Sequence, residues 1–194
     1  MYSSEMSRPI NEERFEDLRS AIIQYLLDHG ITNLSLRPLA KAVRSSPRAL
    51  LYHFGSKEKL VISALGEIRQ RQLLLFLQIQ SDTFIDACLE VWNALSSPSL
   101  EKQVRLFFEL YGIAVRQPAL YKEFLTSVVG DWLEFTVQQL RKEGVQPQKA
   151  LSLATIVLAG LRGFLLDLCA TQDRERINQA VFVWVGTLQE MVTK

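Results

Sequence analysis

The chain has 194 residues, of which 48% are hydrophobic and 22% are charged, so it can bury a substantial core and is not a disordered chain. The formal net charge of +1 identifies no partner, and Cys88 and Cys169 lie too far apart for a metal-binding motif. The first residues lack the apolar segment of a signal peptide, and Arg162 and Asp167 interrupt the longest apolar stretch. We therefore expect a cytoplasmic protein with no membrane partner, no metal and no cofactor.

The first predicted helix covers residues 11–29. Its apolar side chains recur at the three- and four-residue spacing of a helix, and they are Phe15, Leu18, Ile22, Tyr25 and Leu26. Gly30 follows the helix, and glycine readily takes the left-handed conformation that ends many helices. The segment therefore predicts one amphipathic helix with a defined C-terminal end.

Two short helices are predicted next, over residues 35–43 and 46–54. Ser35 and Ser46 are suited to cap their N-termini, and Pro47 occupies the first helical position, where proline is favoured. Two short helices joined by a tight turn and held on a preceding helix form a helix-turn-helix, whose second helix enters the major groove of DNA. The order of elements therefore predicts a DNA-binding motif.

The same stretch is the most basic part of the chain. From residue 35 to residue 59, six Lys and Arg side chains accompany a single acid, Glu58. A locally basic window is typical of a nucleic-acid contact surface, although a solvated helix face can have the same composition. Helical spacing turns Leu50 and Phe54 inward. The side chains expected to contact DNA are Arg37, Arg44, Arg48, Ala49, Tyr52, His53 and Lys57.

These side chains divide by chemistry into two groups. Arg48 and Tyr52 are the candidates for contact with base edges, because they lie on the second short helix. Side chains around it that can donate hydrogen bonds would bind phosphates, and they are Arg37, Arg44, His53 and Lys57. Two alternatives remain at this stage: His53 could be a packed histidine at a helix end, and Tyr52 could be a core aromatic.

The residues of this stretch resemble the signature of the TetR family. The matching segments are LAKAVRSSPRALLYHF at residues 39–54 and KEKL at residues 57–60. Three positions depart from the family pattern. Arg44 stands at the turn glycine, Ser45 at an apolar turn residue, and Leu51 at the tyrosine that commonly touches a phosphate. If the turn requires a positive φ, Arg44 carries about 1 kcal/mol of strain.

The resemblance implies an all-α fold of about nine helices. It places a three-helix DNA-binding domain at residues 1–58 and a ligand-binding and dimerisation domain at residues 59–194. The periodicity of the second part independently predicts helices over residues 56–80, 83–95, 100–116, 119–143, 147–170 and 174–192. By resemblance, the chain would be a homodimeric repressor that binds a near-palindromic double-stranded operator and responds to a small molecule.

The middle helices are rich in aromatic side chains. Such residues are more often core than ligand-binding, but the TetR family encloses a small-molecule pocket in this region, so the resemblance implies an effector, and the aromatic content suggests an apolar one. The candidate pocket residues are Trp92, Gln103, Phe107, Phe108, Tyr111, Phe124 and Trp132.

The last two helices carry apolar stripes, and Gly160 and Gly163 permit close helix packing. By resemblance, this pair would form a four-helix interface with a second copy. The candidate interface residues are Leu158, Leu161, Leu165, Val181, Trp184 and Leu188. A dimer would place two reading heads about 34–36 Å apart on successive major grooves. Alternatively, the pair only closes the core of one chain.

The sequence also bears on two other classes of protein. An enzyme is not expected, because the only histidines are His29 and His53 and the sequence lacks a Walker loop, a GxSxG motif, an HExxH motif and a dinucleotide-binding glycine motif. A helical protein-interaction bundle without DNA binding is the remaining alternative. It would not require the basic window to coincide with two short serine-capped helices.

Overall fold

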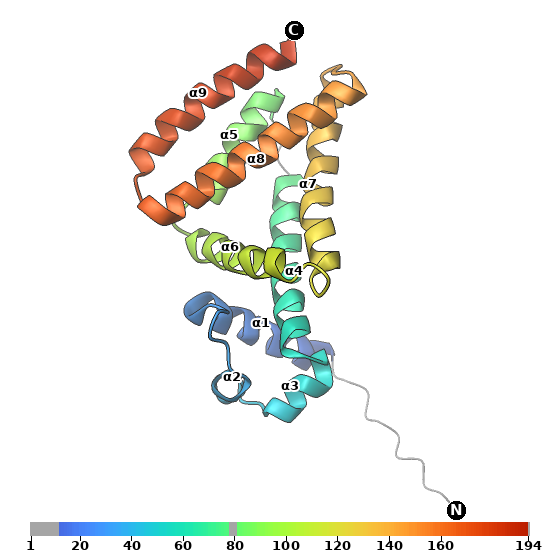
Figure 1. The fold of residues 1–194 in the computed structure, drawn as a ribbon, viewed down its shortest axis with the longest axis vertical. Coiled ribbons are helices and arrows are strands. Elements are labelled where there is room, and N and C mark those ends of the chain that lie inside the picture. Colours follow the sequence, from blue (N-terminus) through green and yellow to red (C-terminus); the bar gives the residue numbers. More distant parts are fainter. Residues whose placement is uncertain (1–11, 78–80, 194) are drawn as a thin grey trace, which may run out of the picture. The chain divides into compact units, whose positions relative to one another are not determined.

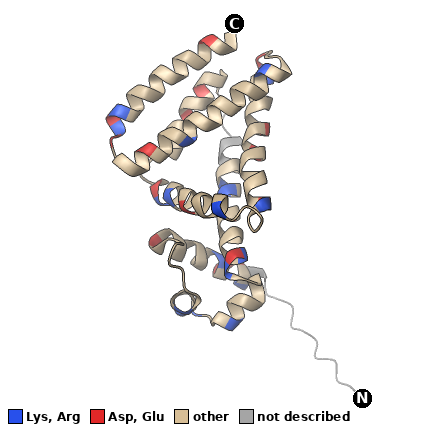
Figure 2. Cartoon of the chain, viewed as in Figure 1, with Lys and Arg blue, Asp and Glu red and all other residues tan. Residues whose placement is uncertain are grey.

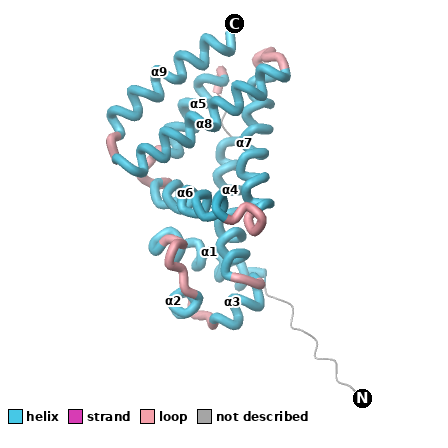
Figure 3. Tube along the Cα trace, in the orientation of Figure 1, coloured by secondary structure: helices cyan, strands magenta, loops and turns pink. Residues whose placement is uncertain are grey.

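The structure is a computed structural model that describes residues 12–77 and 81–193. Every regular element in these ranges is an α-helix (Figures 1 and 3). The nine helices are α1 Glu12–His29, α2 Leu36–Ala42, α3 Pro47–Phe54, α4 Lys57–Leu77, α5 Phe84–Leu95, α6 Glu101–Arg116, α7 Lys122–Lys142, α8 Pro147–Thr171 and α9 Arg174–Thr193. The predicted all-α class is confirmed. The predicted helical residues 11 and 78–80 lie outside the described ranges.

The chain divides into two compact units, Met1–Ile68 and Arg69–Lys194. Helix α4 contributes residues to both units. The boundary between the compact units follows residue 68, whereas the predicted DNA-binding domain ends at residue 58. The predicted boundary was placed by function and not by packing, so it stays a prediction.

The core of the first unit joins its short helices to the longer ones. Helix α1 contacts α2, and α2 contacts α3. The side chains at its centre are at most 1% exposed, and they are Ile22, Leu26, Leu39, Leu50 and Leu60. Full burial of one such side chain contributes about 1.5–3 kcal/mol. Leu39 of α2 and Leu50 of α3 therefore fix the two short helices in place.

The N-terminal caps of these helices follow local sequence. The Ser46 hydroxyl accepts a hydrogen bond from the Ala49 N–H at 3.1 Å, and the Ser56 hydroxyl accepts one from the Lys59 N–H at 3.1 Å. The cap predicted at Ser46 is therefore confirmed. Ser35 has the extended backbone of a capping residue, but its side chain accepts no such bond.

The core of the second unit is built around α8. This helix contacts α6, α7 and α9, and α9 also contacts α5. The inner face of α8 is buried through residues that recur every three or four positions, including Ala154, Leu161 and Leu168. Helix α8 is long and apolar enough to cross a membrane, but a core helix passes the same test, and its inner face lies in this core.

Both cysteines carry free thiols. Cys88 is buried on α5, and burial together with the nearby Glu143 raises the pKa of its thiol to about 12. Cys169 is half-buried on α8, and burial raises its pKa as well. Because the thiolate is the reactive form, both cysteines are poor nucleophiles at neutral pH.

Candidate DNA interface and ligand cavity

The basic side chains of α2 and α3 lie on the surface of the first unit. Arg37, Arg44, Arg48 and Lys57 are exposed. Figure 2 shows Lys and Arg on these two helices and no acidic residue, in agreement with the sequence between residues 36 and 54. The side chain of Tyr52 is 74% exposed, so it is not the core aromatic of the alternative interpretation.

The turn between α2 and α3 contains Arg44, the residue that replaces the turn glycine of the family pattern, and its backbone has the positive φ that a glycine would favour. Arg44 has a φ of +52°, in the left-handed region. The turn is closed by two backbone hydrogen bonds, from the Arg44 N–H to the Lys41 carbonyl at 3.3 Å and from the Ser45 N–H to the Ala40 carbonyl at 2.8 Å. A non-glycine residue in this region costs about 1–2 kcal/mol. The expected strain is therefore present.

His53 is packed on one side. Its ring centroid lies 5.7 Å from that of Phe15 and 5.5 Å from that of Tyr52, and its Nδ1 atom is buried without a hydrogen-bond partner. A buried N–H without an acceptor is costly, so this environment favours the tautomer that carries its proton on Nε2. His53 therefore has the packed role of the alternative interpretation, and its Nε2–H can still donate a hydrogen bond to a phosphate oxygen.

The remaining two candidates flank α3. Lys57 begins α4, and its ammonium lies 3.5 Å from the Leu34 carbonyl, at the limit of a hydrogen bond. This weak contact leaves the exposed ammonium able to bind an anion. Ala49 is half-buried in the first turn of α3, and its N–H is the group that Ser46 caps.

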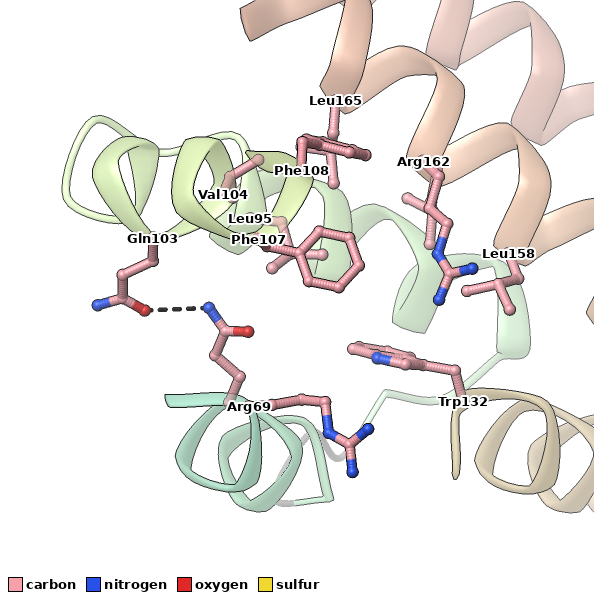
Figure 4. Close-up of a pocket in the computed structure, with 12 residues that line it drawn as sticks. Arg69, Leu95, Gln103, Val104, Phe107, Phe108, Trp132, Leu158, Arg162 and Leu165 are labelled. Atoms are coloured by element: carbon pink, nitrogen blue, oxygen red, sulfur yellow. Dashed lines mark hydrogen bonds between the residues drawn. The ribbon is translucent and has the colours of Figure 1, made fainter. Parts of the chain in front are cut away.

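The second unit contains a cavity of about 560 Å³, including its open mouth (Figure 4). Its lining comes from helices α4 to α8. Four of the seven candidate pocket residues contribute to it, and they are Gln103, Phe107, Phe108 and Trp132. These four side chains therefore border a cavity, and their role in binding a ligand stays a prediction.

The other three candidates lie elsewhere. Trp92 is buried, and its indole N–H donates to the Asn178 side chain at 3.0 Å. Phe124 is buried outside the cavity lining. Tyr111 does not line the cavity, but its hydroxyl lies 3.4 Å from the guanidinium of Arg162. Helical spacing does not distinguish an aromatic that fills a core from one that borders a cavity, which explains these differences.

Three polar lining residues were not among the candidates. Arg69 and Gln72 come from α4, and Arg162 comes from α8. The Gln72 amide donates to the Gln103 amide oxygen at 3.0 Å, which is the dashed line in Figure 4. The available sequence signal was Arg162, a charge inside the most apolar helix. The lining is thus apolar with a cationic side, rather than apolar throughout.

The candidate dimer residues lie mostly inside the chain. Five of them are buried in the core of the second unit, namely Leu158, Leu161, Leu165, Val181 and Leu188. The sixth, Trp184, is half-buried and packs edge-on against Phe164 with ring centroids 5.4 Å apart. A Cβ atom on Gly160 would lie 2.6 Å from the Trp184 indole, so the close approach expected at Gly160 is confirmed. A Cβ atom on Gly163 would meet no described atom within 4 Å beyond its own stretch of helix.

The outer faces of α8 and α9 carry a different apolar set. Figure 1 shows the two helices next to each other, and they are in contact. Their large exposed side chains are Leu151, Ile156, Leu166, Phe182, Val183 and Met191. Phe182 and Val183 are 74% and 70% exposed. Sequence spacing missed this set because α8 is apolar on both of its faces.

The helix-turn-helix of the first unit and the all-helical second unit define an all-α protein with an N-terminal domain of the DNA-binding helix-turn-helix class. Residues 18–64 match the family described as "Bacterial regulatory proteins, tetR family". The N-terminal domain of the chain therefore belongs to the TetR family of bacterial regulatory proteins.

Solved structures share the fold over nearly the whole chain. A transcriptional regulator from Rhodococcus sp. Rha1 is 19% identical, with a TM-score of 0.77, and the match covers 90% of this chain and 95% of that one. GusR of Salmonella enterica is 23% identical, with a TM-score of 0.72 and coverages of 98% and 97%. BioQ bound to its double-stranded DNA operator is 21% identical, with a TM-score of 0.58 and coverages of 91% and 96%. No curated relative matches the chain in sequence.

Proposed function

We propose that this regulator is a cytoplasmic homodimeric repressor without catalytic activity, which binds a near-palindromic operator and releases or holds it according to a small molecule in the cavity. One observation carries the DNA-binding part. Every charged side chain between Leu36 and Phe54 is basic and exposed, on a helix-turn-helix whose Tyr52 projects into solvent. The likeness to BioQ, whose structure contains its operator, supports the same role.

Within residues 1–58, the proposed contacts follow from position on the motif. Arg48 and Tyr52 of α3 would meet base edges, with the small Ala49 beside them to permit close approach to the groove. The phosphate contacts would come from Arg37, Arg44, His53 and Lys57. Base contacts specify sequence, whereas phosphate contacts fix the position of the protein on the duplex.

Residues 59–194 would bind the effector and a second copy of the chain. The proposed dimer surface is the outer face of α8 and α9, which includes Leu166, Phe182 and Val183. These exposed apolar side chains lie on two helices that contact each other, and burial against a second copy would remove them from water. A twofold dimer also suits a near-palindromic operator, because each copy reads one half-site.

The connection between effector and DNA would run through α4. This helix begins at Lys57, a proposed phosphate contact, and carries Arg69 and Gln72 of the cavity lining. A ligand that displaces either side chain therefore acts on the same helix that begins at the DNA-binding motif. Such a ligand changes the DNA affinity only if it binds more tightly to the protein with α4 in one position than with α4 in another.

A salt series with DNA from upstream of the protein's own gene tests the proposal. We expect tight binding that weakens steeply with salt, because bound cations release counterions from DNA. Lys57→Ala should weaken binding to all sequences and lower the salt slope by about one, and Arg48→Ala should relax specificity by about 1–3 kcal/mol at one position. Lys122→Ala, which removes an exposed lysine of α7, is the matched control. Weak binding with no salt dependence would favour the protein-interaction bundle instead.

A further inference from the structure

Arg162 stands out among the charged residues of the second unit. It lies in the apolar helix α8 and lines the cavity, and Figure 4 shows its guanidinium directed into the space between Phe107 and Trp132. Within the described part of the chain, no carboxylate forms an ion pair with it, and the cavity lining contains no Asp or Glu. A half-buried cation without a counterion is costly to desolvate.

The groups that hold Arg162 are all neutral. Its guanidinium donates to the Val128 carbonyl at 2.7 Å and to the Tyr111 hydroxyl at 3.4 Å. It also lies over the rings of Tyr111 and Phe107, with distances to the centroids of 5.1 and 5.8 Å. These contacts orient the group and use two of its five N–H donors, but they leave its charge uncompensated. In keeping with this, desolvation lowers the pKa of Arg162.

Arg69, the other arginine of the lining, provides an internal comparison. It donates to the Asp131 carboxylate at 2.7 Å and to the Ser127 hydroxyl at 2.8 Å. Its charge is therefore neutralised by the protein. The cavity thus has one excess positive charge, which is located at Arg162.

We propose that the cavity binds a small organic monoanion, a carboxylate attached to an apolar body, with the carboxylate on Arg162. The body would lie among Phe107, Trp132 and Leu158, which surround the guanidinium in Figure 4. A carboxylate matches the planar guanidinium and would supply the missing counterion. This inference rests on the proposed function only in so far as the bound molecule is the effector.

The decisive experiment compares matched ligands on the full-length wild-type protein. The probes are 3-phenylpropanoate with 3-phenylpropanamide, and octanoate with octanamide, followed by tryptophan fluorescence and by thermal shift. Each carboxylate should bind at least about tenfold more tightly than its amide, because hydrogen bonds between ions are about twice as strong as neutral ones. Equal affinity within both pairs, tighter binding of the amides, or no saturation by any probe would overturn the proposal.

Substitutions assign the preference to one residue. Arg162→Met should bring the carboxylate-to-amide affinity ratio close to one, and Arg162→Lys should keep part of the preference. Arg105→Met, which removes an exposed arginine of α6 outside the cavity, should leave the ratio unchanged. A merely structural Arg162 would lower the melting temperature of the variants without changing this ratio. Should Arg162→Met fail to fold, the ratio in the wild type and in Arg162→Lys still decides.

DNA binding by the ligand-free protein separates this inference from the proposed function. Failure to bind DNA together with a clear carboxylate preference would overturn the regulatory role and leave the anion site standing. Salt-dependent DNA binding without any carboxylate preference would overturn the anion site and leave the DNA-binding role standing.

Discussion

Arg44 has two properties that substitutions can separate, a left-handed backbone and an exposed charge near α3. Arg44→Gly should increase the free energy of unfolding by up to about 1 kcal/mol, because glycine takes a positive φ without strain. The gain is limited because glycine also raises the conformational entropy of the unfolded chain. Arg44→Ala removes the same charge and keeps the strain, so it should not stabilise. Urea denaturation measures both, and equal stabilisation by the two variants would contradict the role of the backbone.

Both variants should also lose the proposed phosphate contact. Their DNA affinities should therefore fall together while their stabilities differ. A normal affinity in Arg44→Gly with a weakened one in Arg44→Ala would instead mean that turn geometry, not charge, supports DNA binding.

Gly160 marks the closest approach of α8 to α9. A Cβ atom there would lie 2.6 Å from an indole that is itself packed on Phe164, so Gly160→Ala should destabilise the chain by about 1–3 kcal/mol. Gly112→Ala is the matched control, because a Cβ atom on this helical glycine would meet no described atom within 4 Å beyond its own stretch of helix. It should be neutral or stabilising by up to about 1 kcal/mol. Thermal and urea denaturation of the pair would show the difference, and similar values for both would contradict it.

The N-terminal caps of α2 and α3 provide a comparison between elements. The Ser46 side chain caps α3, whereas that of Ser35 makes no capping bond to α2. Ser46→Ala should cost about 1 kcal/mol, and Ser35→Ala should change stability by less than about 0.5 kcal/mol. Urea denaturation gives both values. A larger loss in Ser35→Ala would mean that its side chain caps the helix in solution.

A second consequence of the Ser46 cap concerns function. Loss of the cap frays the start of α3, which carries Arg48 and Ala49. Ser46→Ala should therefore weaken DNA binding more than Ser35→Ala does. The two serines thus separate the stability of the proposed recognition helix from that of its neighbour.

The sequence was sufficient to predict the helices because their ends depend on local signals. Ser46, Pro47, Gly55 and Gly144 act within a few residues of themselves, so the predicted and observed ends agree closely. The helix-turn-helix was predictable for the same reason, since its basic, polar and apolar positions lie within 25 consecutive residues, from Ser35 to Lys59.

The residues of the cavity and of the outer α8 and α9 faces depend on contacts between distant helices. Helical spacing gives α8 two apolar faces, and only tertiary packing assigns Leu161 inward and Leu166 outward. The same limitation hid Arg69, whose partner Asp131 lies 62 positions away on α7. For Arg162, the sequence showed a charge in an apolar helix but not the cavity that it faces.

On the scale of the whole molecule, a repressor that reads two half-sites requires two copies of its DNA-binding domain. The outer face of α8 and α9 is the surface that would join them. Phe182 and Val183 together place an aromatic and a branched side chain in solvent on α9, with Leu166 exposed on α8. Burial of such side chains yields about 25 cal/mol per Å² of apolar surface, which is a substantial gain for a dimer.

Phe182→Asp should therefore convert the proposed dimer to a monomer. An unpaired charge buried at an interface costs about 3–5 kcal/mol, so the dimer dissociation constant should rise at least about 100-fold. Sedimentation velocity over a concentration series measures this, with circular dichroism to verify helicity. Leu120→Asp, at an exposed leucine between α6 and α7, is the control and should remain dimeric. The monomer should bind a single half-site as tightly as the wild type does, but it should not bind the full operator more tightly than a half-site. If the Phe182→Asp protein stays dimeric, the dimer interface must lie on another face.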